Sequence, residues 1–277
     1  EYVSLENIKS EIDYENLLIG YDCIIHCAGK VPETNKADDL KDYNEINIKS
    51  TKLFADLAVK AGVSKLIFLS SVSVYGDSND FNIFKKNKKS KIFNYKDIPN
   101  PKSSYAKSKL AAEELLLEIS KRTGLEVVIV RLPLVYGQGV KGNIRRLIKL
   151  INLRVPLPFG LVNNKRSLIG IDNLVDVLIR CIDHPEAVGR TFLVSDGEDL
   201  STPKLLKNIA FALNHPIHMF PFPIRVLVII SYLLNKSIEM NKLIGSLQID
   251  NNHICEKLNW TPPVSVSEGI KRMFNNK

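Results

Sequence analysis

Lys65-Leu-Ile-Phe-Leu-Ser70 is a short, almost continuously apolar run, and three more runs of this kind occur in the chain. They are residues 21–27, 126–131 and 191–195. Runs that are apolar along their whole length are typical of strands covered on both faces, as in parallel sheets. Helical patterns separate them, over residues 47–61, 104–122 and 172–184. Strands that alternate with helices predict an α/β fold, built on a Rossmann-like, doubly wound parallel sheet.

The ends of these helical patterns carry their own signals. Gly62 and Gly124 follow the first two, as expected at helix C-termini. Asp172 opens the third and is predicted to be its N-cap.

The residue pattern changes after Ser195. From there on, apolar helical segments are broken by prolines. Residues 137–166 also read as an insertion between sheet strands. We therefore expect two interleaved parts. The first is a sheet-bearing part of residues 1–137 and 167–198, and the second is a smaller, mostly helical part of residues 138–166 and 199–277.

The longest apolar run, residues 224–234, is interrupted by Arg225. It has about half the length that a bilayer needs, so no membrane span is expected. We predict instead a buried helix, or part of one that covers a groove.

Composition narrows the classes of partner. The chain has 277 residues, 45% hydrophobic and 25% charged, with a formal net charge of +8. A basic surface suits nucleic acid, membrane or a phosphate-bearing substrate. The chain lacks the aromatic-basic motif of nucleic-acid binders and a basic amphipathic helix of the membrane type. A protein that binds RNA or a membrane through its net charge is therefore the least favoured interpretation.

The four cysteines are Cys23, Cys27, Cys181 and Cys255. Cys23 and Cys27 fall on one predicted strand, too far apart to pair, and no C-x-x-C occurs. The five histidines show no metal-ligand spacing. We expect a reduced, cytoplasmic protein without a metal.

Tyr105 and Lys109 lie four residues apart at the start of a helical pattern, so they share a helix face. A neighbouring ammonium favours the phenolate, and the pair predicts a tyrosine pKa lowered from about 10 toward neutrality. Such a phenol can exchange a proton with a hydroxyl or a ketone. The spacing alone fits equally well a half-exposed tyrosine whose lysine points to water.

Six segments, in order, carry a resemblance. Residues 69–76 read L-S-S-V-S-V-Y-G, residues 105–109 read Y-A-K-S-K, and residues 131–137 read R-L-P-L-V-Y-G. The other three are residues 22–29, 47–51 and 166–174. Together they resemble the extended short-chain dehydrogenases/reductases, and within them the NAD-dependent nucleotide-sugar epimerase/dehydratase family. The narrower likeness is to UDP-hexose 4-epimerases and UDP-N-acetylquinovosamine-type 4-keto reductases.

The resemblance implies a cofactor, NAD or NADP, bound by the sheet-bearing part. It implies Ser71, Tyr105 and Lys109 as the catalytic residues, with Tyr105 as the acid/base. The implied cofactor-binding residues are Ala28, Gly29, Asn47, Ser70, Tyr105, Lys109 and Pro133. Asn47 would brace the site or touch the cofactor, and its simpler interpretation is a helix cap.

The resemblance also implies a UDP-sugar bound by the helical part. Its implied contacts are Ser71, Ser73, Asn143, Phe159 and Arg166. A guanidinium forms paired hydrogen bonds to phosphate, so Arg166 would hold the diphosphate. The simpler interpretations are a polar strand end for Ser71 and a surface arginine for Arg166.

Family dehydratases carry Asp-Glu after the catalytic Ser or Thr, whereas this chain has Val72-Ser73, so dehydration is disfavoured. The resemblance then implies a UDP-sugar 4-epimerase of surface-polysaccharide (lipopolysaccharide O-antigen) sugar biosynthesis, acting as a homodimer. One alternative is an NAD(P)H-dependent UDP-4-keto-sugar reductase. The other is a catalytically silent, nucleotide-binding regulatory relative.

The chain departs from the family in one respect. No Gly-rich phosphate loop is present, so the N-terminal strands of the family's sheet are expected to be absent. Either this is an incomplete stretch of a normal enzyme or the natural product is truncated. In both cases we expect the stretch alone to bind NAD poorly, and the choice between NAD and NADP stays open.

Overall fold

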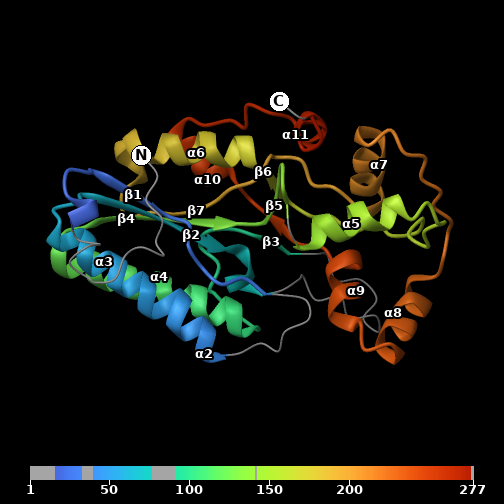
Figure 1. Ribbon diagram of the computed structural model, residues 1–277, viewed down its shortest axis with the longest axis horizontal. Coiled ribbons are helices and arrows are strands. Elements are labelled where there is room, and N and C mark those ends of the chain that lie inside the picture. The colour runs from blue at the N-terminus through green and yellow to red at the C-terminus, as the bar shows by residue number, and fades with distance from the viewer. Residues whose placement is uncertain (1–15, 33–39, 77–90, 141, 276–277) are drawn as a thin grey trace.

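The protein is described by a computed structural model, which covers residues 16–32, 40–76, 91–140 and 142–275. Its centre is a parallel sheet of four strands in the order β1-β2-β4-β7 (Figure 1). The strands are β1 (Cys23–His26), β2 (Lys65–Ser71), β4 (Glu126–Leu132) and β7 (Thr191–Leu193). All four apolar runs therefore form strands, and the predicted Rossmann-like sheet is confirmed.

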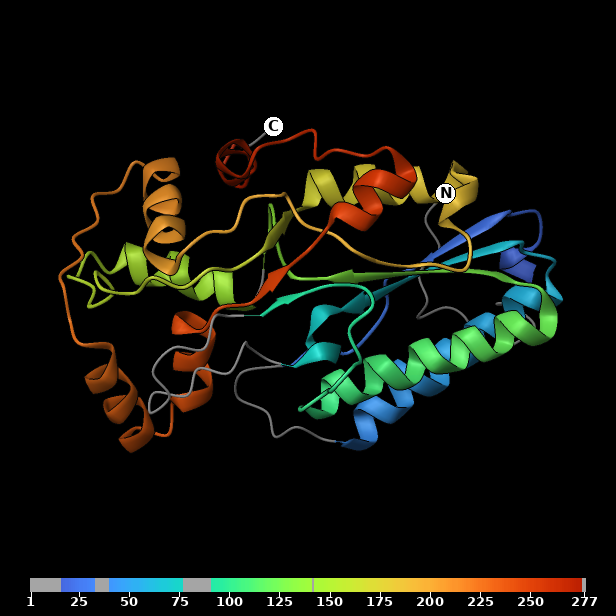
Figure 2. The ribbon, with the colours of Figure 1, turned by 180° about the vertical axis from the view of Figure 1, so that it is seen from behind.

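Helices cover both faces of this sheet, as a doubly wound fold requires (Figures 1 and 2). On one face lie α3 (Ser50–Lys60) and α4 (Ser104–Thr123), packed on β2 and β4. On the other lie α6 (Ile171–Asp183) and α10 (Asn252–Leu258). Burial on both faces explains why the strands are apolar throughout.

Helix α4 has the clearest local signals. The side chain of Ser103 caps it by accepting a hydrogen bond from the backbone N–H of Ala106, at 3.2 Å. Gly124 ends it in the left-handed conformation, with φ 81°, which glycine adopts without a steric penalty.

Two predicted helix starts are wrong. The helix expected from Asn47 begins at α2 (Leu40–Tyr43) and continues through a π-helical stretch, Asn44–Lys49, into α3. Asn47 is thus inside the helix and is not its cap. The N-cap of α6 is Gly170, and Asp172 lies in the first turn, where it pairs with Arg272 at 3.0 Å.

The second core joins the remaining helices. It is formed by α5 (Gly142–Asn152), α7 (Thr202–Ala212), α8 (Ile224–Leu233), α9 (Ser237–Ile244) and α11 (Val266–Arg272). Two small parallel pairs connect it to the sheet: β5 (Leu134–Tyr136) with β6 (Leu168–Gly170), and β3 (Ile92–Phe93) with β8 (Gln248–Ile249). Ser201 caps α7, as Pro203 in its first turn suggests.

Helix α8 differs from its prediction. Only Leu227 and Ser231 of its ten residues are buried, so the apolar run does not form a buried helix. Of the helices in the described ranges, none has the length and apolar character to cross a membrane.

Candidate active site

Three side-chain hydroxyls meet where β2 ends. Ser71 is the last residue of β2 and caps the 3₁₀ turn Val72–Tyr75. Its Oγ accepts a hydrogen bond from the Ser73 backbone N–H at 3.2 Å and from the Ser73 hydroxyl at 2.9 Å. The phenol of Tyr105, from the first turn of α4, lies within hydrogen-bonding reach of Ser71. Residues 71 and 105 are therefore neighbours at the end of β2, and their predicted catalytic roles stay predictions.

The predicted lowering of the tyrosine pKa is wrong for the chain by itself. Burial raises the pKa of Tyr105, and only the hydrogen bond with Ser71 acts in the opposite direction. The reason is the direction of Lys109. Its ammonium lies 4.1 Å from the centre of the Phe68 ring, so it contacts the face of that ring and not the phenol of Tyr105.

Lys109 is nonetheless an unusual cation. It is 5% exposed, and within the described ranges its ammonium donates no hydrogen bond. Burial lowers its pKa to about 8, while the carboxylate of Glu113 one turn later opposes that shift. A buried ammonium with unused donors is ready to bind hydroxyls of a ligand.

Glu113 organises a network that sequence reasoning missed. It accepts hydrogen bonds from the Ser70 hydroxyl and from Arg131, whose Nε and Nη2 lie 3.0 and 2.5 Å from its two carboxylate oxygens. Nη1 of Arg131 donates to the Tyr75 hydroxyl at 2.5 Å. The sequence held one indication of this network: Glu113 follows Lys109 by four residues, so both lie on the buried face of α4. The Ser70 hydroxyl donates to this network, and its predicted contact with a cofactor stays a prediction.

Asn47 ties three segments together, as its bracing role predicts. Its Oδ1 accepts from the Lys30 backbone N–H at 2.7 Å, and its Nδ2 donates to the Lys30 carbonyl at 3.0 Å and to Ser108 Oγ at 2.9 Å. The loop after β1 is thereby fixed against the π-helical stretch and α4.

Ala28 and Gly29 are exposed on that loop. A Cβ on Gly29 would lie 3.2 Å from Asn47 Oδ1 and 3.6 Å from the Lys109 ammonium. The loop, Asn47 and Lys109 therefore form one corner at the carboxyl edge of the sheet, the edge where open α/β sheets bind ligands. Pro133 is buried between β4 and β5, at the same edge.

His26, at the end of β1, lies beneath this corner. It is 5% exposed, its Nε2 is 3.0 Å from Thr51 Oγ1, and its ring stacks on Phe68. Burial, with the Lys109 charge second, lowers the pKa of His26 to about 4. A neutral ring is thus kept next to a buried cation. The sequence placed His26 on an apolar strand, but it did not predict that Thr51 is its hydrogen-bond partner.

Arg166 lies on the helical side. Its backbone bridges Leu200 and Leu247, and its Nη1 donates to the Gly245 carbonyl at 3.1 Å. Burial alone lowers its pKa to about 10, and among the described residues no carboxylate pairs with it. A desolvated guanidinium without a counter-ion is suited to a ligand anion.

The other residues predicted to bind the substrate differ in their burial and packing. Asn143 is half-buried in the first turn of α5. Phe159 is 5% exposed and packs in the helical core, so its ring is occupied by packing. Ser73 lies beside Ser71, as described above.

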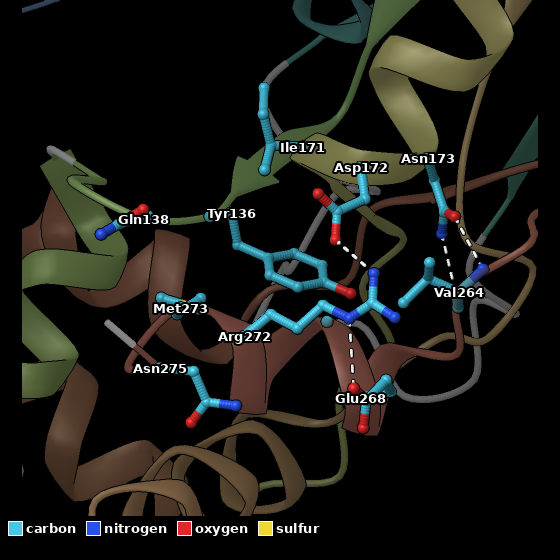
Figure 3. Close-up of a pocket in the computed structure, with 13 residues that line it drawn as sticks. Tyr136, Gln138, Ile171, Asp172, Asn173, Val264, Glu268, Arg272, Met273 and Asn275 are labelled. Carbon is cyan, nitrogen blue, oxygen red and sulfur yellow. Dashed lines mark hydrogen bonds and ion pairs between the residues drawn. The ribbon is translucent and has the colours of Figure 1, made fainter. Parts of the chain in front are cut away.

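A cavity of about 430 Å³ lies elsewhere, between α6 and α11 (Figure 3). None of the predicted site residues lines it. Its polar side chains pair with one another: the Arg272 guanidinium bridges Asp172 and Glu268, and the hydroxyl of Tyr136 donates to Asp196 at 2.7 Å. The charged side chains that line it, Asp172, Glu268 and Arg272, are thus engaged with one another.

Several known proteins share sequence or fold with this chain. The profile of the NAD dependent epimerase/dehydratase family matches residues 7–195. The UDP-glucose 4-epimerase of Vibrio cholerae is 38% identical over 269 residues, which cover 96% of this chain and 80% of the relative. The N-acetyl-alpha-D-glucosaminyl-diphospho-ditrans,octacis-undecaprenol 4-epimerase of Escherichia coli O157:H7 is 24% identical over 286 residues, covering 98% and 82%.

Among solved structures, UDP-glucuronic acid 4-epimerase from Bacillus cereus in complex with NAD superposes with a TM-score of 0.72. The two are 21% identical, and the match covers 98% of this chain and 77% of the other. At that identity the match establishes the fold.

Proposed function

The chain belongs to the NAD-dependent epimerase/dehydratase family, and from this premise we propose that it is a UDP-sugar 4-epimerase. The observation that carries the proposal is the pairing of two sites. Ser71, Tyr105 and Lys109 lie at the carboxyl edge of the sheet. Arg166, in the helical part, is half-buried and has no carboxylate partner among the described residues.

The residues of this corner fit a ribose of NAD, whereas the sequence has no Gly-rich loop for the NAD diphosphate. Lys109 has a buried ammonium with unused donors, which suits the hydroxyls of a ribose. Gly29 leaves the space beside that ammonium free of a side chain. When bound, NAD would supply the acceptor for the sugar hydride and a positive ring beside the phenol.

The chain's own residues would then handle the proton. Tyr105 takes the proton of the C4 hydroxyl, and the hydroxyl of Ser71 holds the same oxygen. After the 4-keto sugar has turned, the hydride would return to the other face of C4 and Tyr105 would return the proton to the oxygen, so sugar and cofactor end in the oxidation states in which they began. Burial favours the neutral phenol, so the reaction needs a positive charge beside the tyrosine before it can act as a base.

Arg166 would hold the other end of the substrate. A diphosphate brings the negative charge that this guanidinium lacks, and paired hydrogen bonds fix its orientation. Holding the nucleotide while leaving the sugar free to turn is what an epimerase needs from this residue.

The finer parts of the proposal are a UDP-linked hexose, a place in the synthesis of surface-polysaccharide sugars and a homodimer. Support for the first is the name of the Vibrio cholerae relative. Support for the second is the lipid-linked sugar in the name of the Escherichia coli O157:H7 relative. The homodimer rests on the family resemblance, and light scattering measures it.

The test is to incubate the enzyme and catalytic NAD with UDP-glucose, UDP-galactose and their N-acetylated forms. We expect the 4-epimer by chromatography, with no net loss of cofactor. Tyr105→Phe should lower kcat by about 10²–10⁴-fold, whereas Tyr232→Phe, on an exposed tyrosine of α8, should leave it unchanged. Stoichiometric loss of NAD(P)H in a parallel incubation with a UDP-4-keto sugar, without any epimer from the UDP-hexoses, would show a reductase instead. Full activity in Tyr105→Phe would remove the proposed mechanism.

A further inference from the structure

Helix α8 is apolar on two opposite faces. One face, with Ile224, Leu227 and Val228, packs against the helical core. The other carries Val226, Ile229, Ile230 and Leu233, which share a face because they are spaced i, i+3, i+4 and i+7. These four side chains are exposed, Ile229 by 59% and Leu233 by 74%. A helix that is apolar all round is normally buried all round, so this second face calls for a partner.

The exposed apolar surface continues past the end of α8. Tyr232, Leu234 and Ile238 are 75%, 64% and 68% exposed, and Ile238 begins the neighbouring helix α9. We call α8, α9 and the turn between them the α8–α9 hairpin. Figures 1 and 2 both show it at the end of the molecule remote from α3 and α4. Isolated exposed apolar residues are ordinary, whereas seven gathered on one hairpin indicate an interaction surface.

Basic side chains flank this surface. Arg225 stands in the first turn of α8, Lys236 lies in the turn, and Lys242 lies on α9, and all three are exposed. Glu239 is the one acidic residue of the hairpin. Positive charge also accumulates in the wider region: residues 138–166 and 199–277 hold 16 Lys and Arg against five Asp and Glu, a net charge of +11.

Charge therefore decides between two occupants. A second copy of the chain, docked through the same face, would bring these cations against their own copies, at a repulsive cost. A bilayer with anionic headgroups meets both features at once, because it takes apolar side chains at the headgroup–acyl boundary and phosphates beside the lysines and arginines. Ten residues of helix span about 15 Å, which suits a helix lying on a membrane rather than crossing it.

We infer that the α8–α9 hairpin docks the protein on an anionic membrane surface. Val226, Ile229, Ile230 and Leu233 enter the boundary layer, and Arg225, Lys236 and Lys242 contact lipid phosphates. The end of α9 leads directly into Gly245, whose carbonyl binds Arg166. Docking therefore places the Arg166 anion site close to the bilayer. The inference stands independently of the reaction proposed above.

The experiment is flotation of the protein with vesicles of phosphatidylcholine containing 30% phosphatidylglycerol, compared with phosphatidylcholine alone, at 0.1 and 0.5 M NaCl. We expect binding to the anionic vesicles that weakens in the higher salt. The double variant Ile229→Asp/Leu233→Asp should bind at least about tenfold more weakly. The triple variant Arg225→Gln/Lys236→Gln/Lys242→Gln should lose about as much.

Ile179→Asp is the matched control. Ile179 is 54% exposed on α6, outside the hairpin, and this variant should bind the vesicles like the unaltered protein. Thermal unfolding shows that the variants are folded, since all the altered side chains are exposed. Light scattering on the same samples tests the second-copy alternative. The inference is overturned if the unaltered protein does not float with anionic vesicles, if Ile179→Asp loses as much binding as the double variant, or if the hairpin variants convert a dimer to a monomer.

Discussion

Arg166 is a cation that the fold leaves without a counter-ion among the described residues, and its desolvation lowers its pKa to about 10. A charge held in this way destabilises the unliganded protein, because water solvates it better than its surroundings do. If Arg166 binds the proposed diphosphate, it does so at a cost to the stability of the fold, a trade found where binding sites are built into stable scaffolds.

Arg166→Gln is therefore predicted to move stability and binding in opposite directions. The free energy of unfolding should rise by about 1 kcal/mol, because a desolvated charge is removed, while the affinity for UDP falls by tenfold or more. Urea denaturation and calorimetric titration with UDP measure the two effects. Arg145→Gln, on the exposed side of α5, is the control and should change neither. A variant that is both less stable and equally able to bind UDP would show that Arg166 is structural.

His26 predicts an acid-sensitive fold. Its pKa is lowered from about 6.5 to about 4, so below pH 6.5 the unfolded chain binds a proton that the folded chain refuses. Stability is therefore lost as the pH falls from 6.5 to 4. Between pH 7.5 and 5.0 this one group should remove about 2 kcal/mol from the free energy of unfolding.

Urea denaturation at the two pH values measures the loss, and His26→Phe should reduce it by about that amount. The comparison is between variants because His253, whose pKa is also lowered, remains in both. An equal pH dependence in the two proteins would mean that His26 is protonated in the folded state.

Among the elements, the strands were predictable and the contacts between elements were not. The run Lys65–Ser71 is apolar because helices cover both of its faces, so local sequence records its surroundings. The start of the helix containing Asn47 was missed because the residues before it, from Leu40, are mixed and polar. Apolar residues around α8 indicate burial, but a sequence does not state what covers each face.

In the candidate site, too, some features could be predicted from the sequence and others could not. The sequence predicted that Ser71 ends a strand and that Tyr105 begins a helix, and the structure has both. The roles of these residues and of Arg166 stay predictions. The pKa of Tyr105 could not be predicted from spacing, since it depends on the Lys109 ammonium turning to the Phe68 ring. Sequence analysis also missed the pairing of Glu113 with Arg131, 18 residues away, which only the tertiary fold creates.

That pairing joins α4 to β4, and it gives the element-scale prediction. The side chains of Glu113 and Arg131 are 2% and 8% exposed, and breaking a buried pair by removing one charge costs about 3–5 kcal/mol. Glu113→Gln should therefore lower the free energy of unfolding by about 3 kcal/mol, measured by urea denaturation.

The neighbouring Glu114 is exposed on the same helix, and Glu114→Gln should change the stability by less than about 0.5 kcal/mol. The matched pair separates burial from helix propensity, since both variants make the same chemical change one residue apart. Equal effects would mean that the charge pair contributes nothing beyond its place in the helix.

At the scale of the whole molecule, charge is divided between the two predicted parts. Residues 138–166 and 199–277 carry the net +11, so the remaining residues carry −3 of the overall +8. Arg166 therefore lies within the basic part, and the field around it attracts anions before they make contact. The overall net charge of +8 does not reveal this concentration of positive charge around Arg166.

Binding of UDP is accordingly predicted to depend on salt. The Debye length falls from about 10 Å at 0.1 M to about 3 Å at 1 M salt, so the dissociation constant of UDP should rise several-fold between 0.05 and 0.5 M NaCl. Uridine is the matched control, because it carries the same base without the diphosphate and should bind equally at both salt concentrations. Arg166→Gln should flatten the salt dependence without abolishing it, since the rest of the basic part remains. If uridine lost affinity as steeply as UDP, salt would be acting on the base contacts or on the fold. The basic part would then have no special place in capturing the substrate.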